Sequence, residues 1–400
     1  MASKQNLAIA NHNKNDEFYT RLIDIEKELE HYRKHFKGKT VYCNCDDPFE
    51  SNFFKYFVLN FNKLGLKKLI ATCYAAPSIT YGQLSLFDIP SGDIIKENKP
   101  YKAIVTKVYD VTGDGENNMV DVAKLFKIKE NKLTELRDDG DFRSEECLEL
   151  LKKADIIVTN PPFSLFREYI AILMKYKKEF LIIGNANAIS YKEFFPLLKE
   201  NKVWMGANIH SRYRKFFVPD NYPLNTAECG IDNDGKKFIK LKNVRWFTNL
   251  DHKQSHKDLI LIKKYNPKEY PKYDNYNAIN VDRVKDIPYN YEGVMGVPIT
   301  FLDKYNPDQF EIIGLGNSRD NFMPNKDYIN PKKILKDGSI KNVTAINHVL
   351  AINYKNKPNK VHYISDNSNY LIAPYVRILI RNKHPEPRKG IKNSYRRIKE

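Results

Sequence analysis

The residues best suited to chemistry form one short run, Asn160-Pro161-Pro162-Phe163, which directly follows the apolar segment 154–159. Two successive prolines fix φ and remove two backbone donors, so carbonyls of this loop stay available as acceptors. The Asn160 side chain adds an acceptor and a donor, and Phe163 adds a flat apolar face. A plain turn that ends a strand is the alternative interpretation.

These groups match the needs of an aromatic amino nitrogen, which is a poor nucleophile because its lone pair is delocalised into the ring. Accepting both amino hydrogens, at the Asn160 side-chain oxygen and the Pro161 carbonyl, would favour the pyramidal nitrogen as a methyl group is transferred. Phe163 would stack on a base that has been flipped out of a helix. We therefore expect Asn160, Pro161, Pro162 and Phe163 to be the catalytic loop.

The elements around this loop alternate between strand and helix. Apolar spacing predicts an amphipathic helix over 21–37, which Gly38 ends. Further segments predict strands at 40–45, 68–73, 102–109, 154–159, 180–184 and 238–249, and helices at 53–64, 145–153 and 165–176. The predicted fold class is α/β, a Rossmann-like parallel sheet with helices on both faces, and ligands bind at the carboxyl ends of such strands.

The pattern changes after Tyr265. Residues 266–292 hold three prolines among many tyrosines and asparagines, which indicates an irregular connection. Short strand-like pieces follow at 310–315, 361–365 and 376–380. We expect two domains, a catalytic domain over 1–265 and a mixed α+β region over 266–400 for recognition.

Charge indicates a polyanionic partner. The 66 Lys and Arg outnumber the 49 Asp and Glu, which gives a net charge of +17. Eight of these cations lie in residues 381–400, against Glu386 and Glu400. Compositional drift towards Lys, and a solvated terminal tail, are the alternatives. The apolar runs are far shorter than the ~20 residues that cross a bilayer, so we expect a cytoplasmic protein without a membrane partner.

Several segments resemble a known family. The 160–163 loop resembles the signature of amino-methyltransferases. Segments 15–20, 41–48, 51–54, 295–302 and 304–314 resemble the EcoRI-type adenine-specific DNA methyltransferases. The resemblance implies transfer of a methyl group from S-adenosylmethionine to the exocyclic amino group of adenine in double-stranded DNA, at a short palindrome like GAATTC. It also implies a restriction-modification system, whose endonuclease would act on the same site without direct contact. We expect a monomer.

The resemblance implies a cofactor site at the ends of the first two strands. Phe18, Tyr19 and Thr20 would close the methionine end, and Asp46, Asp47, Pro48 and Ser51 would form the first loop. Asp141, followed by Phe142, would contact the cofactor adenine, and Asn160 would adjoin the cofactor. Either another group binds the ribose, or Tyr74 packs beside the adenine ring. The sequence departs from the usual pattern in two places. Residues 50–52 stand where glycines are usual, and the second strand lacks the acid that commonly binds the ribose. Each acid could instead be a helix cap or a solvated charge.

Cationic and amide side chains are candidates for DNA contact. A basic-aromatic cluster at 210–217 offers Arg212, Arg214 and Lys215, although it could be a solvated turn. Base readout falls to Arg319, Asn321 and Asn325, and phosphate contacts in the tail to Arg388, Lys389, Arg396 and Arg397. The five cysteines have no metal-ligand spacing, so we expect reduced thiols and no metal.

Two other functions remain open at this stage. The same loop could methylate RNA or a protein amide, and an inert loop would leave a non-catalytic nucleic-acid-binding protein.

Overall fold

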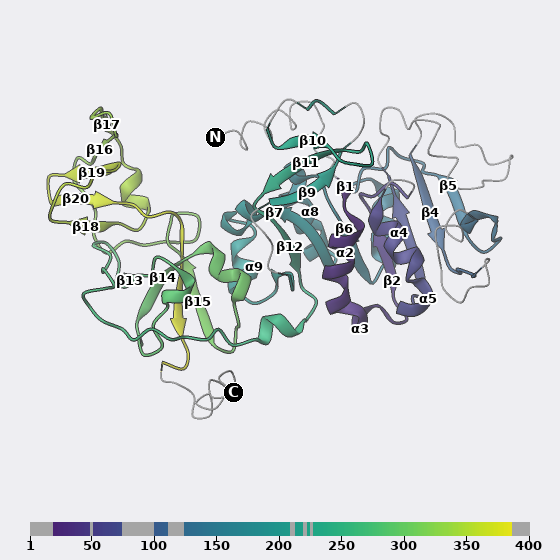
Figure 1. Cartoon of the computed structure of the whole chain (residues 1–400), viewed down its shortest axis with the longest axis horizontal. Coiled ribbons are helices and arrows are strands. Elements are labelled where there is room, and N and C mark those ends of the chain that lie inside the picture. Colours follow the sequence, from purple (N-terminus) through teal and green to yellow (C-terminus); the bar gives the residue numbers. More distant parts are fainter. Residues whose placement is uncertain are drawn as a thin grey trace. The chain divides into compact units, whose positions relative to one another are not determined.

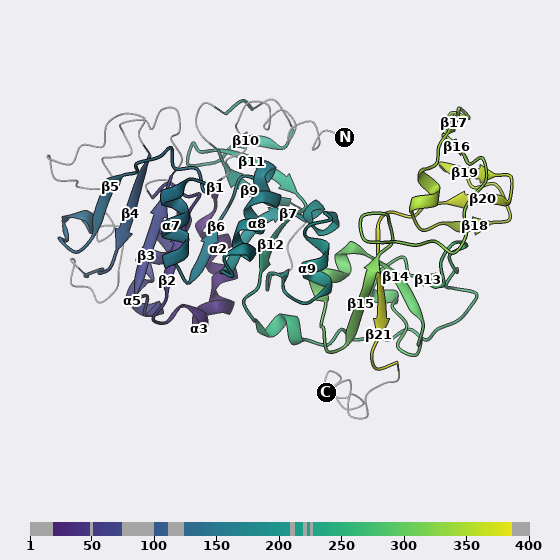
Figure 2. The same cartoon turned by 180° about the vertical axis from the view of Figure 1, so that it is seen from behind.

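The computed structural model describes residues 19–48, 51–73, 100–110, 124–208, 213–218, 222–224 and 227–385. They form a mixed α/β protein with several sheets, drawn from opposite sides in Figures 1 and 2. The chain divides into two compact units, Met1–Ala188 with Val203–His252, and Ile189–Lys202 with Lys253–Glu400.

An eight-stranded sheet forms the centre of the first unit, in the order β5-β4-β3-β2-β6-β7-β12-β8. Its middle strands run parallel: β3 (Lys68–Thr72), β2 (Thr40–Cys43), β6 (Ile156–Thr159) and β7 (Glu179–Asn185). They are apolar and almost fully buried, as expected for strands whose sheet is covered on both faces.

Helices cover both faces of this sheet. Those in front in Figure 1 are α2 (Leu22–Leu29), α3 (Arg33–Phe36), α4 (Asn52–Leu59) and α5 (Phe61–Leu64). Those in front in Figure 2 are α7 (Glu145–Lys153) and α8 (Phe166–Lys175). Ser51 and Ser144 cap α4 and α7 by accepting backbone N–H bonds, and Gly65 ends α5 with a left-handed φ of 62°.

Antiparallel strands flank the parallel centre. On one side lie β4 (Tyr101–Val105) and β5 (Lys132–Glu135), and on the other β12 (Val244–Thr248) and β8 (Trp204–Met205). The expectation of a wholly parallel sheet is therefore wrong at both edges. The single strand predicted over 238–249 is also wrong, because Asn243 takes a φ of 59° and divides it into β11 (Lys237–Lys242) and β12.

A smaller antiparallel sheet belongs to the same unit, in the order β1-β9-β11-β10. It joins β1 (Tyr19–Thr20) to β9 (Tyr213–Phe217), and β11 to β10 (Cys229–Ile231). This sheet brings the start of the described chain beside residues almost 200 positions later.

The second unit is mainly β. One sheet has the order β13-β14-β21-β15, with β13 (Ala278–Asn280), β14 (Val294–Pro298), β21 (Arg377–Asn382) and β15 (Phe310–Leu315). The other has the order β17-β16-β19-β20-β18, with β17 (Ile340–Asn342), β16 (Lys332–Ile334), β19 (His362–Ser365), β20 (Ser368–Ile372) and β18 (Ile352–Tyr354). Helix α9 (Phe195–Lys199) also belongs to this unit. Of the helices in the described part of the chain, none is long and apolar enough to span a membrane.

Candidate active site

The Asn160 loop begins where β6 ends, at the carboxyl edge of the parallel strands. Pro161 is buried, while Asn160 and Pro162 are half-buried. The Pro162 carbonyl accepts the Leu165 amide at 3.0 Å, which starts the short 3₁₀ turn Phe163–Leu165 ahead of α8. This bond uses the Pro162 carbonyl, whereas the acceptor predicted for the substrate is the Pro161 carbonyl.

Asp46 connects the end of β2 to this loop. Its buried carboxylate accepts hydrogen bonds from the Ser51 hydroxyl at 2.8 Å, the Thr159 hydroxyl and the Asn160 backbone amide. Burial raises the pKa of Asp46 to about 7, although these hydrogen bonds act to lower it. The Asp46 amide also donates to the Thr72 carbonyl at 3.2 Å. One residue thereby fastens the ends of β2, β3 and β6 together.

Asp47 lies in the same turn and accepts a hydrogen bond from the Tyr101 hydroxyl. Burial raises the pKa of Tyr101, and the Asp47 carboxylate raises it further. The Asp47 carbonyl accepts the Ser51 amide at 2.7 Å, and Ser51 Oγ accepts the Phe53 amide at 3.0 Å. Ser51 therefore closes the turn that follows β2, in the segment where related loops usually have glycines. Pro48 is a buried residue of the same turn.

Asp141 and Phe142 lie beside the end of β3. A Cβ on Gly140 would come within 2.1 Å of the Cys73 carbonyl oxygen, so only glycine permits this approach. The Asp141 carboxylate accepts bonds from Arg143 at 2.7 and 2.8 Å. Burial acts to raise the pKa of Asp141, but Arg143 outweighs it and the pKa is lowered.

Phe142 reaches the neighbouring strand end through an aromatic contact. Its ring meets that of Tyr169 edge to face, with centroids 5.0 Å apart, and the Tyr169 hydroxyl donates to the Asn44 side-chain oxygen directly after β2. The sequence alone did not single out Tyr169 or Asn44, because their roles depend on a contact between residues 125 positions apart.

Tyr19 and Thr20 pair with Phe217 and Phe216 of β9. The Asn52 side-chain amide donates to the Thr20 carbonyl at 2.7 Å, which brings β1 to the first residue of α4. Thr20 Oγ1 is buried and has no hydrogen-bond partner in the described part of the chain. Of the predicted cofactor residues, Phe18 and Tyr74 lie outside the described residues.

The predicted basic cluster on β9 is largely covered. Arg214 is buried and its guanidinium lies 5.5 Å from the Trp246 ring centroid. Lys215, on the other face of the strand, forms an ion pair with Asp232 at 3.3 Å and lies 4.1 Å from the Phe238 ring centroid. The other basic candidates, Arg212, Arg388, Lys389, Arg396 and Arg397, lie outside the described residues.

Arg319, Asn321 and Asn325 share one exposed loop of the second unit, between β15 and β16. Arg319 donates to Ser190 Oγ at 2.8 Å, and the Asn325 amide donates to the Asn275 carbonyl at 3.0 Å. Asn321 has a left-handed φ of 40°. The three side chains therefore project from a loop that is anchored at several points.

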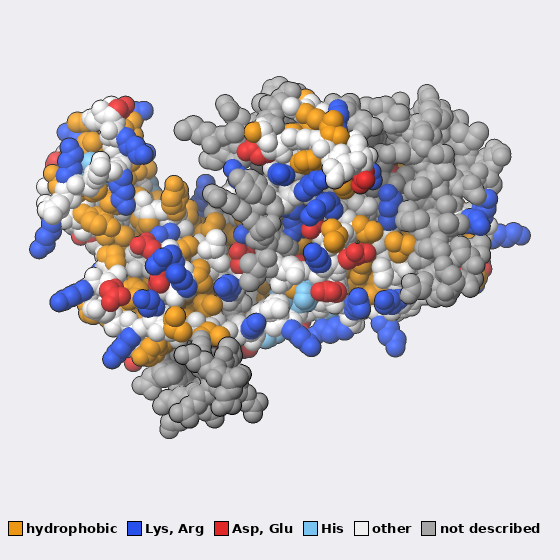
Figure 3. Space-filling view, in the orientation of Figure 1, with side chains coloured by type: hydrophobic (Ala, Val, Ile, Leu, Met, Phe, Trp, Pro, Cys, Tyr) orange, Lys and Arg blue, Asp and Glu red, His pale blue; other side chains and the backbone are white. Residues whose placement is uncertain are grey.

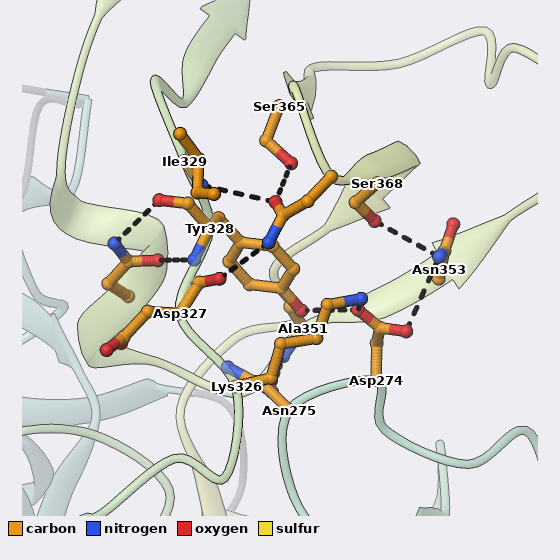
Figure 4. Close-up of polar contacts among 12 residues, drawn as sticks. Asp274, Asn275, Lys326, Asp327, Tyr328, Ile329, Ala351, Asn353, Ser365 and Ser368 are labelled. Atoms are coloured by element: carbon orange, nitrogen blue, oxygen red, sulfur yellow. Dashed lines mark hydrogen bonds and ion pairs between the residues drawn. The ribbon is translucent and has the colours of Figure 1, made fainter.

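Figure 4 shows the anchor beneath this loop, where Lys326 and Tyr328 both turn toward Asp274. Lys326 Nζ and the Tyr328 hydroxyl donate to the same Asp274 oxygen at 2.8 and 3.0 Å. Burial raises the pKa of Tyr328, and the Asp274 carboxylate raises it further. The neighbouring Asn275 side chain accepts the Ala351 amide at 2.9 Å. A polar network thus fixes the end of the candidate recognition loop.

A basic surface that the sequence reading missed covers the five-stranded sheet of this unit. Lysine side chains stand out there in Figure 3. Six of them are exposed, namely Lys332, Lys336, Lys341, Lys355, Lys357 and Lys360, and Asp327, Asp337 and Asp366 are the only acidic residues between 326 and 372. The signal was available as local charge, but these lysines are spread over residues 332–360 and belong to different strands and loops.

Comparison with known proteins identifies the class of this protein. The family described as "Adenine-specific methyltransferase EcoRI" matches residues 6–383. The chain belongs to this family, and it is an adenine-specific DNA methyltransferase.

Individual relatives agree with this family. The chain is 50% identical to the type II methyltransferase M.EcoRI of Escherichia coli over 78% of this chain and 89% of that protein. It is 38% identical to two further type II methyltransferases, M.MgeORF184P of Mycoplasma genitalium and M.MpnI of Mycoplasma pneumoniae, over 75% of this chain and 83% and 82% of theirs. No solved structure matches the chain at a significant level.

Proposed function

We propose that the first unit binds S-adenosylmethionine on a Rossmann-like sheet, at the carboxyl ends of β2, β3 and β6, and methylates the exocyclic amino group of a flipped adenine in duplex DNA. The observation that carries this proposal is the Asp46 carboxylate, which bonds both the turn after β2 and the Asn160 backbone after β6. Asp46 therefore connects the loop that would bind the methyl donor to the loop that would bind the acceptor nitrogen.

The residues at these strand ends fit the cofactor. Asp47 and Asp141 offer carboxylates for its ammonium and hydroxyl groups, and Phe142 offers an apolar face for adenine, while Asp46 holds the loop through its internal bonds. The buried Thr20 hydroxyl without a described partner suits a polar ligand group. When bound, S-adenosylmethionine supplies an electrophilic methyl group on its sulfonium.

The Asn160 loop prepares the acceptor nitrogen. Asn160 Oδ1 and the Pro161 carbonyl would each accept one amino hydrogen, which concentrates the lone pair on nitrogen in the transition state. The Asp46 bond to the Asn160 amide keeps these acceptors fixed, so they do not need to reorganise as charge develops. Phe163 is 7% exposed, so its neighbours would have to move for its ring to stack on the flipped base.

The second unit would carry the target-recognition function that we assigned to residues 266–400. Its exposed loop with Arg319, Asn321 and Asn325 offers groups for base edges, and the basic surface on the five-stranded sheet offers phosphate contacts. We propose a monomer that acts beside a restriction endonuclease of the same specificity.

A nucleoside assay tests this function. The purified chain is incubated with isotopically labelled S-adenosylmethionine and with duplex DNA, RNA or a glutamine-containing peptide, and the products are digested. Labelled N6-methyladenine from duplex DNA is expected, together with thermal stabilisation of the chain by S-adenosylhomocysteine. Label in RNA or peptide alone would reassign the substrate, and an absence of both label and stabilisation would leave a mere binding protein.

A further inference from the structure

Three buried donors that lack a described partner lie close together in the first unit. They are the Thr20 hydroxyl, one guanidinium nitrogen of Arg214 and the indole nitrogen of Trp246. These residues are 3%, 6% and 0% exposed. A buried donor without an acceptor costs free energy, so a cluster of them indicates a ligand that accepts hydrogen bonds.

The strand register brings these donors to one place. Thr20 lies opposite Phe216 on β9, and Arg214 is two residues from Phe216, so Thr20 and Arg214 share one face of the small sheet. Diagonal neighbours of this kind lie roughly 7–8 Å apart. The Arg214 guanidinium in turn stacks on the Trp246 ring, and that ring meets Phe53 of α4 edge to face at 5.8 Å.

Asp24 and Glu28 act to raise the pKa of Arg214, but neither forms an ion pair with it. Asp24 is held by Arg21 through two bonds of 2.8 and 3.1 Å. Glu28 accepts bonds from the Tyr32 hydroxyl and from the Ala207 and Asn208 amides. None of the ion pairs in the described part of the chain includes Arg214.

Charges of both signs lie near Arg214. Burial lowers the pKa of Arg214 to about 10. Asp24 and Glu28 act to raise it, and Arg245 and Arg21 act to lower it. A buried guanidinium that forms no ion pair in the described part of the chain attracts an anion.

The position of the cluster limits which anion can reach it. Asn52, the first residue of α4, donates to the Thr20 carbonyl, and the Asp46–Ser51 turn precedes that helix directly. The cluster therefore adjoins the loop after β2. A guanidinium that is 6% exposed suits a small buried carboxylate better than the phosphate of a bulky duplex.

We propose that Arg214, assisted by Thr20 and Trp246, binds the α-carboxylate of the methionine part of S-adenosylmethionine. This assignment rests on the proposed function. It turns the basic residue of β9 from a DNA contact into a cofactor-binding residue, and it uses planar guanidinium donors for the group that they match best.

Calorimetry with two ligands tests the assignment, since S-adenosylhomocysteine carries the carboxylate and 5′-methylthioadenosine lacks the whole amino acid. Arg214→Met should weaken S-adenosylhomocysteine binding about 10- to 100-fold, as expected for a charged hydrogen bond, and change methylthioadenosine binding less than about 2-fold. Lys240→Met, which removes one exposed cation from the same sheet, should leave both affinities unchanged. Arg214→Lys keeps the charge and should give an intermediate loss, and it serves if the Met variant does not fold.

Each other outcome has a distinct meaning. Equal weakening of both ligands by Arg214→Met would show a structural role and overturn the inference. Unchanged S-adenosylhomocysteine binding with weakened DNA binding would return Arg214 to phosphate contact and overturn it as well. If the wild-type chain bound neither nucleoside, the proposed function itself would fail.

Discussion

At the scale of single residues, the candidate site depends on polar side chains that connect strand ends. The family resemblance predicted Asp46, Asp47 and Asn160 in one cofactor site, and the sheet order brings the carboxyl ends of β2 and β6 side by side. The sequence could not predict the orientation of β9. Arg214 and Lys215 are adjacent basic residues that the sequence does not distinguish. Side chains alternate between the two faces of a strand, so Arg214 is buried and Lys215 is half-buried.

Replacing Asn160 tests the catalytic acceptor. Asn160→Ala should lower kcat by about 100-fold or more while cofactor and DNA affinities stay within about 2-fold, because the missing acceptor acts mainly on the transition state. Single-turnover methylation and equilibrium binding measure the two effects. Asn160→Asp keeps an acceptor oxygen and should retain more activity than the Ala variant. Wild-type turnover in Asn160→Ala would place the chemistry elsewhere.

Asp47 is tested as a cofactor ligand against its bond to Tyr101. Asp47→Ala should raise the Kd for S-adenosylhomocysteine about 10-fold, as one charged hydrogen bond is lost. Tyr101→Phe removes only the hydroxyl that donates a hydrogen bond to the Asp47 carboxylate. If calorimetry gave the same loss for both variants, Asp47 would act by positioning the turn rather than by binding the cofactor.

The raised pKa of Asp46 predicts a pH dependence of stability. The folded chain keeps a proton on this carboxyl up to about pH 7, whereas the unfolded chain releases it near pH 4. The contribution of Asp46 to stability is therefore fully present below pH 4 and is lost as the pH rises to 7, at roughly 1.4 kcal/mol per pH unit.

Asp46→Asn supplies the comparison, because its side chain does not titrate. Urea midpoints at several values between pH 5 and 8 should shift in favour of the variant as the pH rises. Parallel curves for the two proteins would mean that Asp46 titrates normally.

At the scale of elements, the sequence predicted the parallel centre and most of its helices. Apolar runs at 40–45, 68–73, 154–159 and 180–184 all became central strands, because burial on both faces leaves a continuous apolar signal. Strand direction and the division of 238–249 escaped the prediction. These depend on pairing partners and on the left-handed turn at Asn243, which local apolar periodicity does not encode.

The basic surface of the five-stranded sheet gives a prediction at this scale. The combined variant Lys332→Gln, Lys336→Gln and Lys341→Gln should weaken binding to every duplex by a similar factor, because phosphate contacts carry no base information. Each lost contact should reduce the slope of log affinity against log salt by about 0.9.

A matched control replaces three exposed lysines of the first unit with glutamine. These are Lys37, Lys63 and Lys67, which precede β2 and β3. It changes the net charge equally and should leave the salt slope almost unaltered. Equal slopes for the two triple variants would show that total charge, and not this surface, attracts DNA.

At the scale of the whole molecule, a net charge of +17 favours association with DNA wherever the cations lie. The fold shows which of these cations are already bonded to other residues of the protein and which remain exposed. Arg377 is buried and contacts Asn280, and Arg381 pairs with Glu311 at 3.3 Å. Both of these cations therefore serve the second unit, although the sequence counts Arg381 with the basic tail.

The remaining tail residues test how far charge alone accounts for affinity. β21 extends to Asn382, which is buried, so a deletion that spares the fold begins after Pro385. It removes six cations and two acids, including the candidates Arg388, Lys389, Arg396 and Arg397. Binding to specific and scrambled duplexes should weaken by the same factor, with a flatter salt dependence, because about 0.9 of slope is lost per phosphate contact. Isotherms at four or five salt concentrations decide the matter. An unaltered slope would mean that the tail does not contact phosphates, and lost discrimination between the duplexes would mean that it reads bases.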